Sequence, residues 1–141
     1  MKKTWIWIGL CLAAGVVSGN ADEDPRIARV LAGELHEAKA SWWGYAADDN
    51  TANLQAAINS RVATLIVDRQ SGPWITRGLT LVSNQHIVFE KGVELLAKKD
   101  EFRGKADALM TLHGVTNVTL TGYGATLRMR RMDYHSEPYV H

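Results

Sequence analysis

The sequence offers no covalent cross-link to hold a fold together. Cysteine occurs once, at Cys11, so no disulfide can form within the chain, and only three prolines stiffen its 141 residues. No charge of one sign dominates, because 16 lysines and arginines face 15 aspartates and glutamates. Long hydrophobic runs are missing after Val17. This composition excludes a disulfide scaffold, a multi-span membrane protein and a protein drawn to nucleic acid by its net charge.

The longest apolar run lies at the N-terminus. Lys2 and Lys3 precede about 13 apolar residues and small residues follow, which is the pattern of a secretory signal peptide. The run is shorter than the ~20 residues that a membrane-spanning helix needs. We therefore predict that residues 1–21 are a signal peptide, that the protein is secreted, periplasmic or at the cell surface, and that no stable membrane span is left after signal removal. An uncleaved anchor and a lipoprotein modified at Cys11 are the alternatives.

Helical segments are expected before the strands begin. Residues 22–41 form a helical or linker segment, because apolar residues recur there at steps of three and four among charges. Residues 42–62 form a capping turn and helix. The run Asp48-Asp49-Asn50-Thr51 suits the start of this helix, since its side-chain oxygens can accept hydrogen bonds from free backbone N–H groups.

Residues 63–131 consist of very short apolar runs separated by turn residues such as glycine, asparagine and proline. Apolar and polar residues alternate within each run, which predicts a short β-strand with one buried face. The predicted strands contain Leu65 with Val67, Leu79 with Leu81, Ile87 with Phe89, Val93 with Leu95, Val118 with Leu120, and Leu127 with Met129.

An internal repeat decides between the possible β folds. The run Leu79-Thr80-Leu81 matches Met110-Thr111-Leu112 at an offset of 31. A sandwich has no reason to repeat at a fixed period, whereas a solenoid stacks the inward side chains of each coil on those of the next. We expect coils near 63–81, 79–108 and 109–131, with 98–108 as an excursion. Further aligned pairs are Ile87 with Val118 and Phe89 with Leu120 at the same offset and, after one inserted residue, Gly92 with Gly124 and Leu95 with Leu127.

This arrangement resembles the N-terminal end of the right-handed parallel β-helix superfamily, the pectate-lyase-like and polygalacturonase-like proteins. The resemblance covers residues 42–131 and rests on the aspartate-rich turn and helix at 48–58, on 78–95 as first coils, and on 117–127. It implies an all-β fold, a right-handed parallel β-helix solenoid with a short N-terminal capping helix.

The resemblance also implies an exported protein that acts on polysaccharide, including anionic polysaccharide, as a glycoside hydrolase or a polysaccharide lyase. It implies no cofactor, apart from calcium in a lyase-like parent. A non-catalytic β-helix that binds carbohydrate or a surface is the alternative.

No catalytic residue can be carried over from the resemblance. Such residues lie on later coils of the family, and none of its catalytic motifs occurs in this sequence. About three coils precede residue 131, so we expect a truncated β-helix in which residues 132–141 begin a loop or a further coil. The chain is then an N-terminal fragment, inactive alone, of a longer protein whose status as an enzyme stays open.

Three side chains are candidates for binding polysaccharide. Arg128 and Arg130 alternate with Leu127 and Met129, so both guanidiniums should project from one outer face. There they can bind the carboxylates of an anionic polysaccharide, with a plain solvated edge as the alternative. Trp74 can stack on a sugar ring or plug the end of the solenoid. The other aromatic residues with these two interpretations are Trp42, Trp43 and Tyr45.

The acidic residues have simpler structural explanations. Asp48 and Asp49 could form the acid pair that glycoside hydrolysis needs, but helix capping accounts for them better. Asp100, Glu101 and Asp107 fit a solvated loop better than a sugar or calcium site. Neither group is therefore predicted to be catalytic.

The histidines show no spacing that would converge on a metal ion, so we predict no metal site. His86 and His113 are expected at turns between strands. A glycosylation sequon begins at Asn117, where asparagine also suits a turn that leads into a strand. The remaining histidines are His36, His135 and His141.

Overall fold

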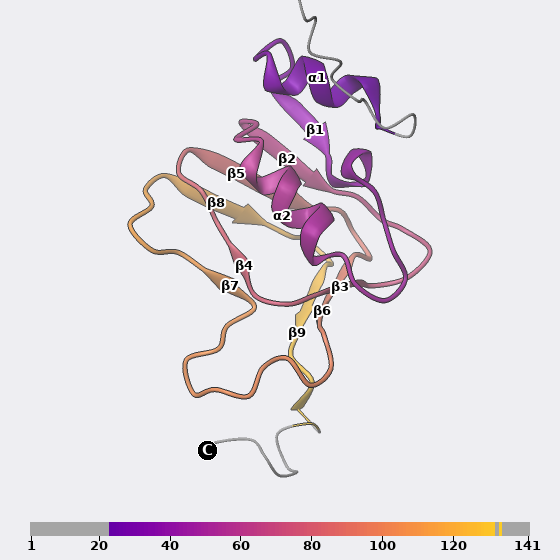
Figure 1. Cartoon of the computed structure of the whole chain (residues 1–141), viewed down its shortest axis with the longest axis vertical. Coiled ribbons are helices and arrows are strands. Elements are labelled where there is room, and N and C mark those ends of the chain that lie inside the picture. The colour runs from indigo at the N-terminus through magenta and orange to yellow at the C-terminus, as the bar shows by residue number, and fades with distance from the viewer. Residues whose placement is uncertain (1–22, 132, 134–141) are drawn as a thin grey trace, which may run out of the picture.

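The computed structural model describes residues 23–131 and residue 133 (Figure 1). Short parallel strands dominate these residues, and helices are few. The helices are α1 (Pro25–Leu31), the 3-10 helix η1 (Ala40–Trp43) and α2 (Thr51–Asn59). The strands are β1 (Glu37–Lys39), β2 (Thr64–Val67), β3 (Trp74–Thr76), β4 (Leu79–Thr80), β5 (Gln85–Phe89), β6 (Glu94–Ala97), β7 (Met110–Thr111), β8 (Val118–Thr121) and β9 (Thr126–Arg128).

The strands of this described part pair in parallel to form three sheets. Sheet A has the order β1-β2-β5-β8, sheet B the order β3-β6-β9, and sheet C pairs β4 with β7. From β2 onward the chain visits sheets A, B and C in turn and then begins again at sheet A. Each new strand therefore lies beside the strand that occupied the same place one circuit earlier.

Inward side chains form columns that run from strand to strand within a sheet. Alternation along each strand points every second side chain to the same face, so residues in register continue one column. In each column, the side chain from the earliest strand is fully buried, whereas the side chain from the latest strand is partly exposed. The columns are Leu65, Ile87 and Leu120 in sheet A, and Trp74, Leu95 and Leu127 in sheet B.

Helix α2 lies over the first strands of the sheets (Figure 1). Leu54 and Ile58, one turn apart on its inner face, are each 2% exposed. They line the same apolar interior space as Leu65 of β2 and Leu79 of β4. The predicted one-sided helix is thus present, and its apolar face closes one end of the core. Within residues 23–131 and 133, no helix combines the length and apolar character needed to cross a membrane.

The residue pairs predicted from the repeat are confirmed in sheets B and C. In sheet A, the predicted pairing is wrong by two residues. Leu79 pairs with Met110 and Leu95 with Leu127, as predicted. In sheet A, however, Ile87 pairs with Leu120 instead of Val118. The connection from β7 to β8 is the cause, because residues 112–117 replace the shorter 81–84 that join β4 to β5. A shift of two residues keeps the inward face inward, so the alternation pattern could not detect it.

The N-terminal segment is only partly helical. Asp24 accepts a hydrogen bond from Arg26 N, and Pro25 occupies the first helical position, so α1 starts where these residues favour it. It ends before Gly33, which adopts a positive φ of 75°. The chain then forms β1, which pairs with β2 and buries Ala38. The segment predicted as helical or linker thus contains one short helix, and strand pairing overrides the loose helical spacing in the rest of it.

Candidate functional site

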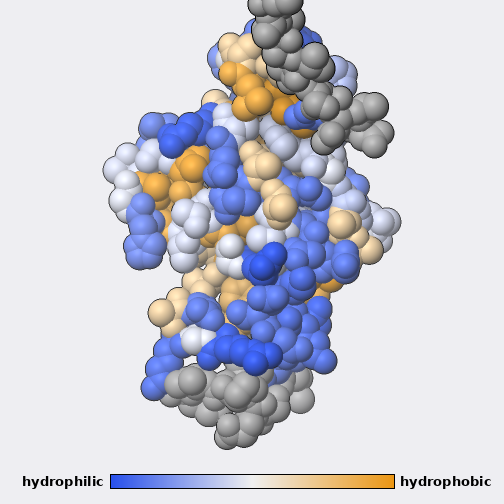
Figure 2. Space-filling model, viewed as in Figure 1, coloured by the Kyte–Doolittle hydropathy of each residue, from blue (hydrophilic) through white to orange (hydrophobic). Residues whose placement is uncertain are grey.

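The two candidate arginines lie at the end of β9. Arg128 is in register with Leu96 of β6, whereas Leu127 is in register with the fully buried Leu95. Arg128 and Leu127 therefore lie on opposite faces of sheet B. Figure 2 shows that the described surface in the lower part of the view is largely hydrophilic. A shallow hollow beside the arginines is lined by Leu96, Arg128, Met129, Arg130, Arg131 and Asp133.

Both candidate arginines have partners within the chain. Arg128 Nη2 lies 2.6 Å from Glu94 Oε1, and the Arg128 side chain is 60% exposed. Arg130 Nε donates a hydrogen bond of 2.9 Å to the carbonyl oxygen of Ala97. A guanidinium has five N–H donors, so these contacts leave others available for a ligand. The third arginine, Arg131, was not anticipated, because strict alternation assigns it to the opposite face.

Trp74 is buried, which is incompatible with sugar stacking, one of the two roles predicted for it. It is 1% exposed, and its indole Nε1 donates a hydrogen bond of 2.9 Å to the carbonyl oxygen of Asp68. Tyr45 packs against it edge-on, with ring centroids 5.3 Å apart. The proposed stacking of Trp74 on a sugar is therefore corrected, because the pairing of β3 with β6 turns this ring into the core.

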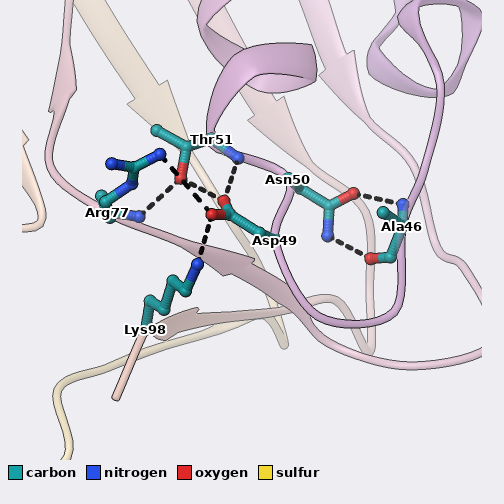
Figure 3. Close-up of polar contacts among 6 residues, drawn as sticks. All are labelled: Ala46, Asp49, Asn50, Thr51, Arg77 and Lys98. Atoms are coloured by element: carbon teal, nitrogen blue, oxygen red, sulfur yellow. Dashed lines mark hydrogen bonds and ion pairs between the residues drawn. The ribbon is translucent and has the colours of Figure 1, made fainter. Parts of the chain in front are cut away.

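Asp49 is the centre of a polar cluster that includes Thr51, Arg77 and Lys98 (Figure 3). Its Oδ1 accepts a hydrogen bond of 2.9 Å from Thr51 N, at the start of α2. Its Oδ2 lies 2.6 Å from Lys98 Nζ and 3.7 Å from Arg77 Nη2. The capping role predicted for Asp49 is thus present, but the two cations come from distant segments that no local pattern indicated. Asp48 is exposed.

The hydrogen bond from Lys98 is the main reason why the pKa of Asp49 lies far below its ordinary value, and bonds from Thr51 add to the effect. A carboxylate that stays ionised in this way cannot donate a proton near neutral pH. Glycoside hydrolysis needs one carboxylic acid with a raised pKa as proton donor. The cluster therefore fastens α2 to the ends of β3 and β6 and does not supply an acid pair.

The excursion between β6 and β7 walls a second hollow. Glu101, Asp107, Thr80 and Thr111 are among its lining residues, so its surface is polar. Asp107 Oδ2 accepts a hydrogen bond of 2.7 Å from Gly104 N, within the same loop. No group of three or more histidine, cysteine or acidic side chains in residues 23–131 and 133 is arranged to hold a metal ion.

Among the described residues, His36, His86 and His113 belong to no group that could hold a metal ion. His86 lies within β5, not at a turn as predicted, and its Nε2 is 2.8 Å from Thr121 Oγ1. His113 lies in the connection between β7 and β8, as predicted. Asn117 has a positive φ of 55° immediately before β8, which is the turn conformation that asparagine tolerates. His135 and His141 lie outside the described residues.

Comparisons of the chain with protein-family models, curated proteins and solved structures gave no match.

Proposed function

We propose that the chain forms a right-handed parallel β-helix in an exported protein that acts on acidic polysaccharide. The repeated visit to sheets A, B and C supports the fold, because it is how a solenoid stacks its strands. Right-handedness is favoured because crossovers between parallel strands of one sheet have this hand in nearly all proteins.

Turn residues stacked on one another also support the β-helix. Asn84 and Asn117 precede β5 and β8, and both have positive φ. Their side chains meet in a hydrogen bond of 3.1 Å from Asn117 Nδ2 to Asn84 Oδ1. Gly92 N likewise donates to the carbonyl oxygen of Gly124 at 2.9 Å. Successive circuits therefore stack individual turn residues on one another at two of their connections, as well as stacking their strands.

The arginine-lined hollow carries the proposal of an acidic ligand. Arg128 and Arg130 lie two positions apart beside Leu96, and a guanidinium binds a carboxylate through two parallel hydrogen bonds. Uronate units of a polysaccharide present such carboxylates at regular intervals. Glu94 is the group that an incoming carboxylate would displace from Arg128.

Binding without catalysis is the second candidate. Asp49, the acid at the centre of the polar cluster, is held ionised by Lys98 and Arg77 and so does not serve as the proton donor of a glycosidase, which supports this candidate. Export rests on residues 1–21, which lie outside the described part.

The first experiment measures the affinity of the full chain for polygalacturonate by calorimetry. We expect binding that weakens as salt increases, because exposed charges are screened. The double variant Arg128→Gln with Arg130→Gln should bind at least about 10-fold more weakly, since each lost charged contact is worth roughly 1.5–3 kcal/mol. Arg29→Gln is the control, because Arg29 is equally exposed on α1. Equal binding of an uncharged β-glucan, or equal loss in the control, would overturn the proposal.

Release of reducing ends or of unsaturated uronides from the same polymer separates catalysis from binding. Either product from the purified chain supports an enzyme. Binding without product supports the non-catalytic candidate.

A further inference from the structure

The turn that leaves sheet A carries an exposed side chain at the same position in every circuit. Arg69, Lys91 and Tyr123 each lie two residues after the end of β2, β5 and β8, respectively, and all three are exposed. Because these strands are neighbours in sheet A, the turns that follow them are neighbours as well. Adjacent strands lie about 4.8 Å apart, so the three residues form a row about 10 Å long. We call this row the turn stripe.

Two glycines make room for the basic side chains of the turn stripe. A Cβ atom on Gly92 would lie 3.7 Å from Arg69 Nε, and one on Gly124 would lie 3.1 Å from Lys91 Cγ. Each cation therefore lies against the glycine of the following circuit. Both glycines have positive φ, 83° and 76°, so the shape of the turn favours glycine as well.

The two cations of the turn stripe have no acidic partner. Within residues 23–131 and 133, neither Arg69 nor Lys91 forms an ion pair. The acid next to them in sequence, Glu90, is turned to the backbone, where its Oε2 accepts a hydrogen bond of 2.9 Å from Arg69 N. Arg128, by contrast, is paired within the chain. The guanidinium and the ammonium group of the turn stripe thus keep their N–H donors for a ligand.

Tyr123 presents its ring to solvent. It is 89% exposed, and glycines flank it on both sides in the sequence, so no adjacent side chain covers the ring. Its place in the last described circuit does not explain this exposure. Arg69 and Lys91 hold the same position in earlier circuits and are exposed although later circuits follow them. Stacking therefore leaves this row of turn positions uncovered, unlike the inward leucines.

We propose that the turn stripe binds consecutive units of an acidic polysaccharide. Tyr123 stacks on the apolar face of one sugar ring, Lys91 binds the carboxylate of that unit, and Arg69 binds the carboxylate of the next. The row is longer than a single sugar ring, so its ligand is an oligomer. The choice of ligand class rests on the proposed function, but the site shares no residue with the arginine-lined hollow.

The chemistry of the turn stripe selects this ligand over others. Two cations without acidic partners favour an anion, which a neutral glucan does not supply. A flat aromatic ring beside them favours a ligand with an apolar ring face. A lipid surface binds through a wider apolar face than one tyrosine supplies. Acidic sugar combines the two features that the row recognises.

The test is an NMR titration of the full chain with a trimer of galacturonate, in which the ring signals of Tyr123 are followed. The spectrum of Tyr123→Phe identifies these signals. We expect them to shift as ligand is added, and to shift less at high salt because exposed charges are screened. Tyr45 is the internal control, since its ring packs against Trp74. A trimer of glucose should leave the Tyr123 signals unchanged.

Variants separate the parts of the turn stripe, with the amide signal of Gly124 as the reporter of binding. Tyr123→Ala should raise Kd at least about 3-fold, whereas Tyr123→Phe keeps the ring and should stay within about 2-fold of the unmodified chain. Arg69→Gln combined with Lys91→Gln should raise Kd at least about 10-fold, because charged contacts are lost. Lys105→Gln is the matched control and should change nothing, because Lys105 is an exposed lysine of the excursion between β6 and β7.

Four results would overturn the proposal. They are unshifted Tyr123 signals at about 10 mM trimer, where millimolar binding is visible, an equal shift with the glucose trimer, an equal loss of binding in Lys105→Gln, and binding of anionic lipid vesicles that depends on Tyr123 while the trimer does not bind. Circular dichroism of each variant shows whether the fold is kept.

The turn stripe and the arginine-lined hollow can fail separately. Arg128→Gln with Arg130→Gln should leave the shifts of the Tyr123 signals unchanged, and their loss in that folded variant would contradict a separate site. If Tyr123 does not respond but that variant binds polygalacturonate more weakly, the hollow stands and the turn stripe is wrong. If Tyr123 responds but that variant binds as tightly as the unmodified chain, the reverse holds.

Discussion

The first strands of the repeating circuit (β2, β3 and β4) and the last ones (β7, β8 and β9) are of the same kind, yet their apolar side chains have different environments. Leu65, Ile87 and Leu120 form one column in register, and their exposed fractions are 0%, 2% and 43%. The residue type hardly changes along this column, but the number of neighbouring layers does. In stacked parallel sheets, an inward position is buried by the strand or helix that follows it, not by its own strand.

The largest effect is expected from the removal of a buried side chain in β2, one of the first strands. Leu65→Ala should lower the free energy of unfolding by about 3 kcal/mol, because truncating a fully buried leucine loses burial and leaves a cavity. Leu120→Ala, in the same column, should cost less than half as much, because Leu120 is 43% exposed. Denaturant titrations of both variants provide the measurement. Equal losses would show that the two ends do not differ in burial.

The second test concerns the fastening of α2. Asp49→Asn should reduce stability at pH 7 by about 1–2 kcal/mol, since it weakens charge-assisted hydrogen bonds with Lys98. The folded pKa of Asp49 lies below its unfolded value near 3.8, so its contribution is present above that pH and is lost as the pH falls further. The difference between Asp49→Asn and the unmodified chain should therefore shrink in acid.

Asp48→Asn is the control for that experiment, because Asp48 is the exposed neighbour of Asp49. It should leave the unfolding free energy within about 0.5 kcal/mol of the unmodified value. A constant difference for Asp49→Asn down to strongly acidic pH would contradict the ionised cluster.

The smallest expected effect is at the edge of β4. Gln55→Ala removes two hydrogen bonds to the backbone of Thr80 and should cost about 1 kcal/mol. Hydrogen exchange at the Thr80 amide should become faster as well. Asn59→Ala is the control, because Asn59 contacts the Gln55 side chain but not β4. Unchanged exchange at Thr80 in Gln55→Ala would mean that its side chain does not protect this edge.

Sequence reasoning located most of the strands, because alternation reports a buried face directly. The helix α2 was also found, since its N-terminal aspartates and apolar face are local features. The offset in sheet A was wrong because side-chain alternation repeats every two residues and tolerates a shift of two. β1 was missed because three residues carry too little pattern, and its formation depends on pairing with β2.

Less of the candidate site than of the fold could be predicted from the sequence. Sequence reasoning left Trp74 either stacked on a sugar or inside the solenoid, because its burial depends on the distant strand β6. The contact between Lys98 and Asp49 joins residues 49 positions apart and has no local signature. Alternation did place Arg128 on the face opposite Leu127, because that relation is set within one strand.

The connections between the strands vary in length, whereas the strands keep their register. Residues 77–78 join β3 to β4, whereas 98–109 make the equivalent connection from β6 to β7, and Leu79 still pairs with Met110. Each doubling of a loop costs only about 0.6 kcal/mol in closure entropy. In evolutionary terms, this connection from sheet B to sheet C is a site where insertions can add new surface, such as a groove wall. The stacked strands that carry it stay unchanged.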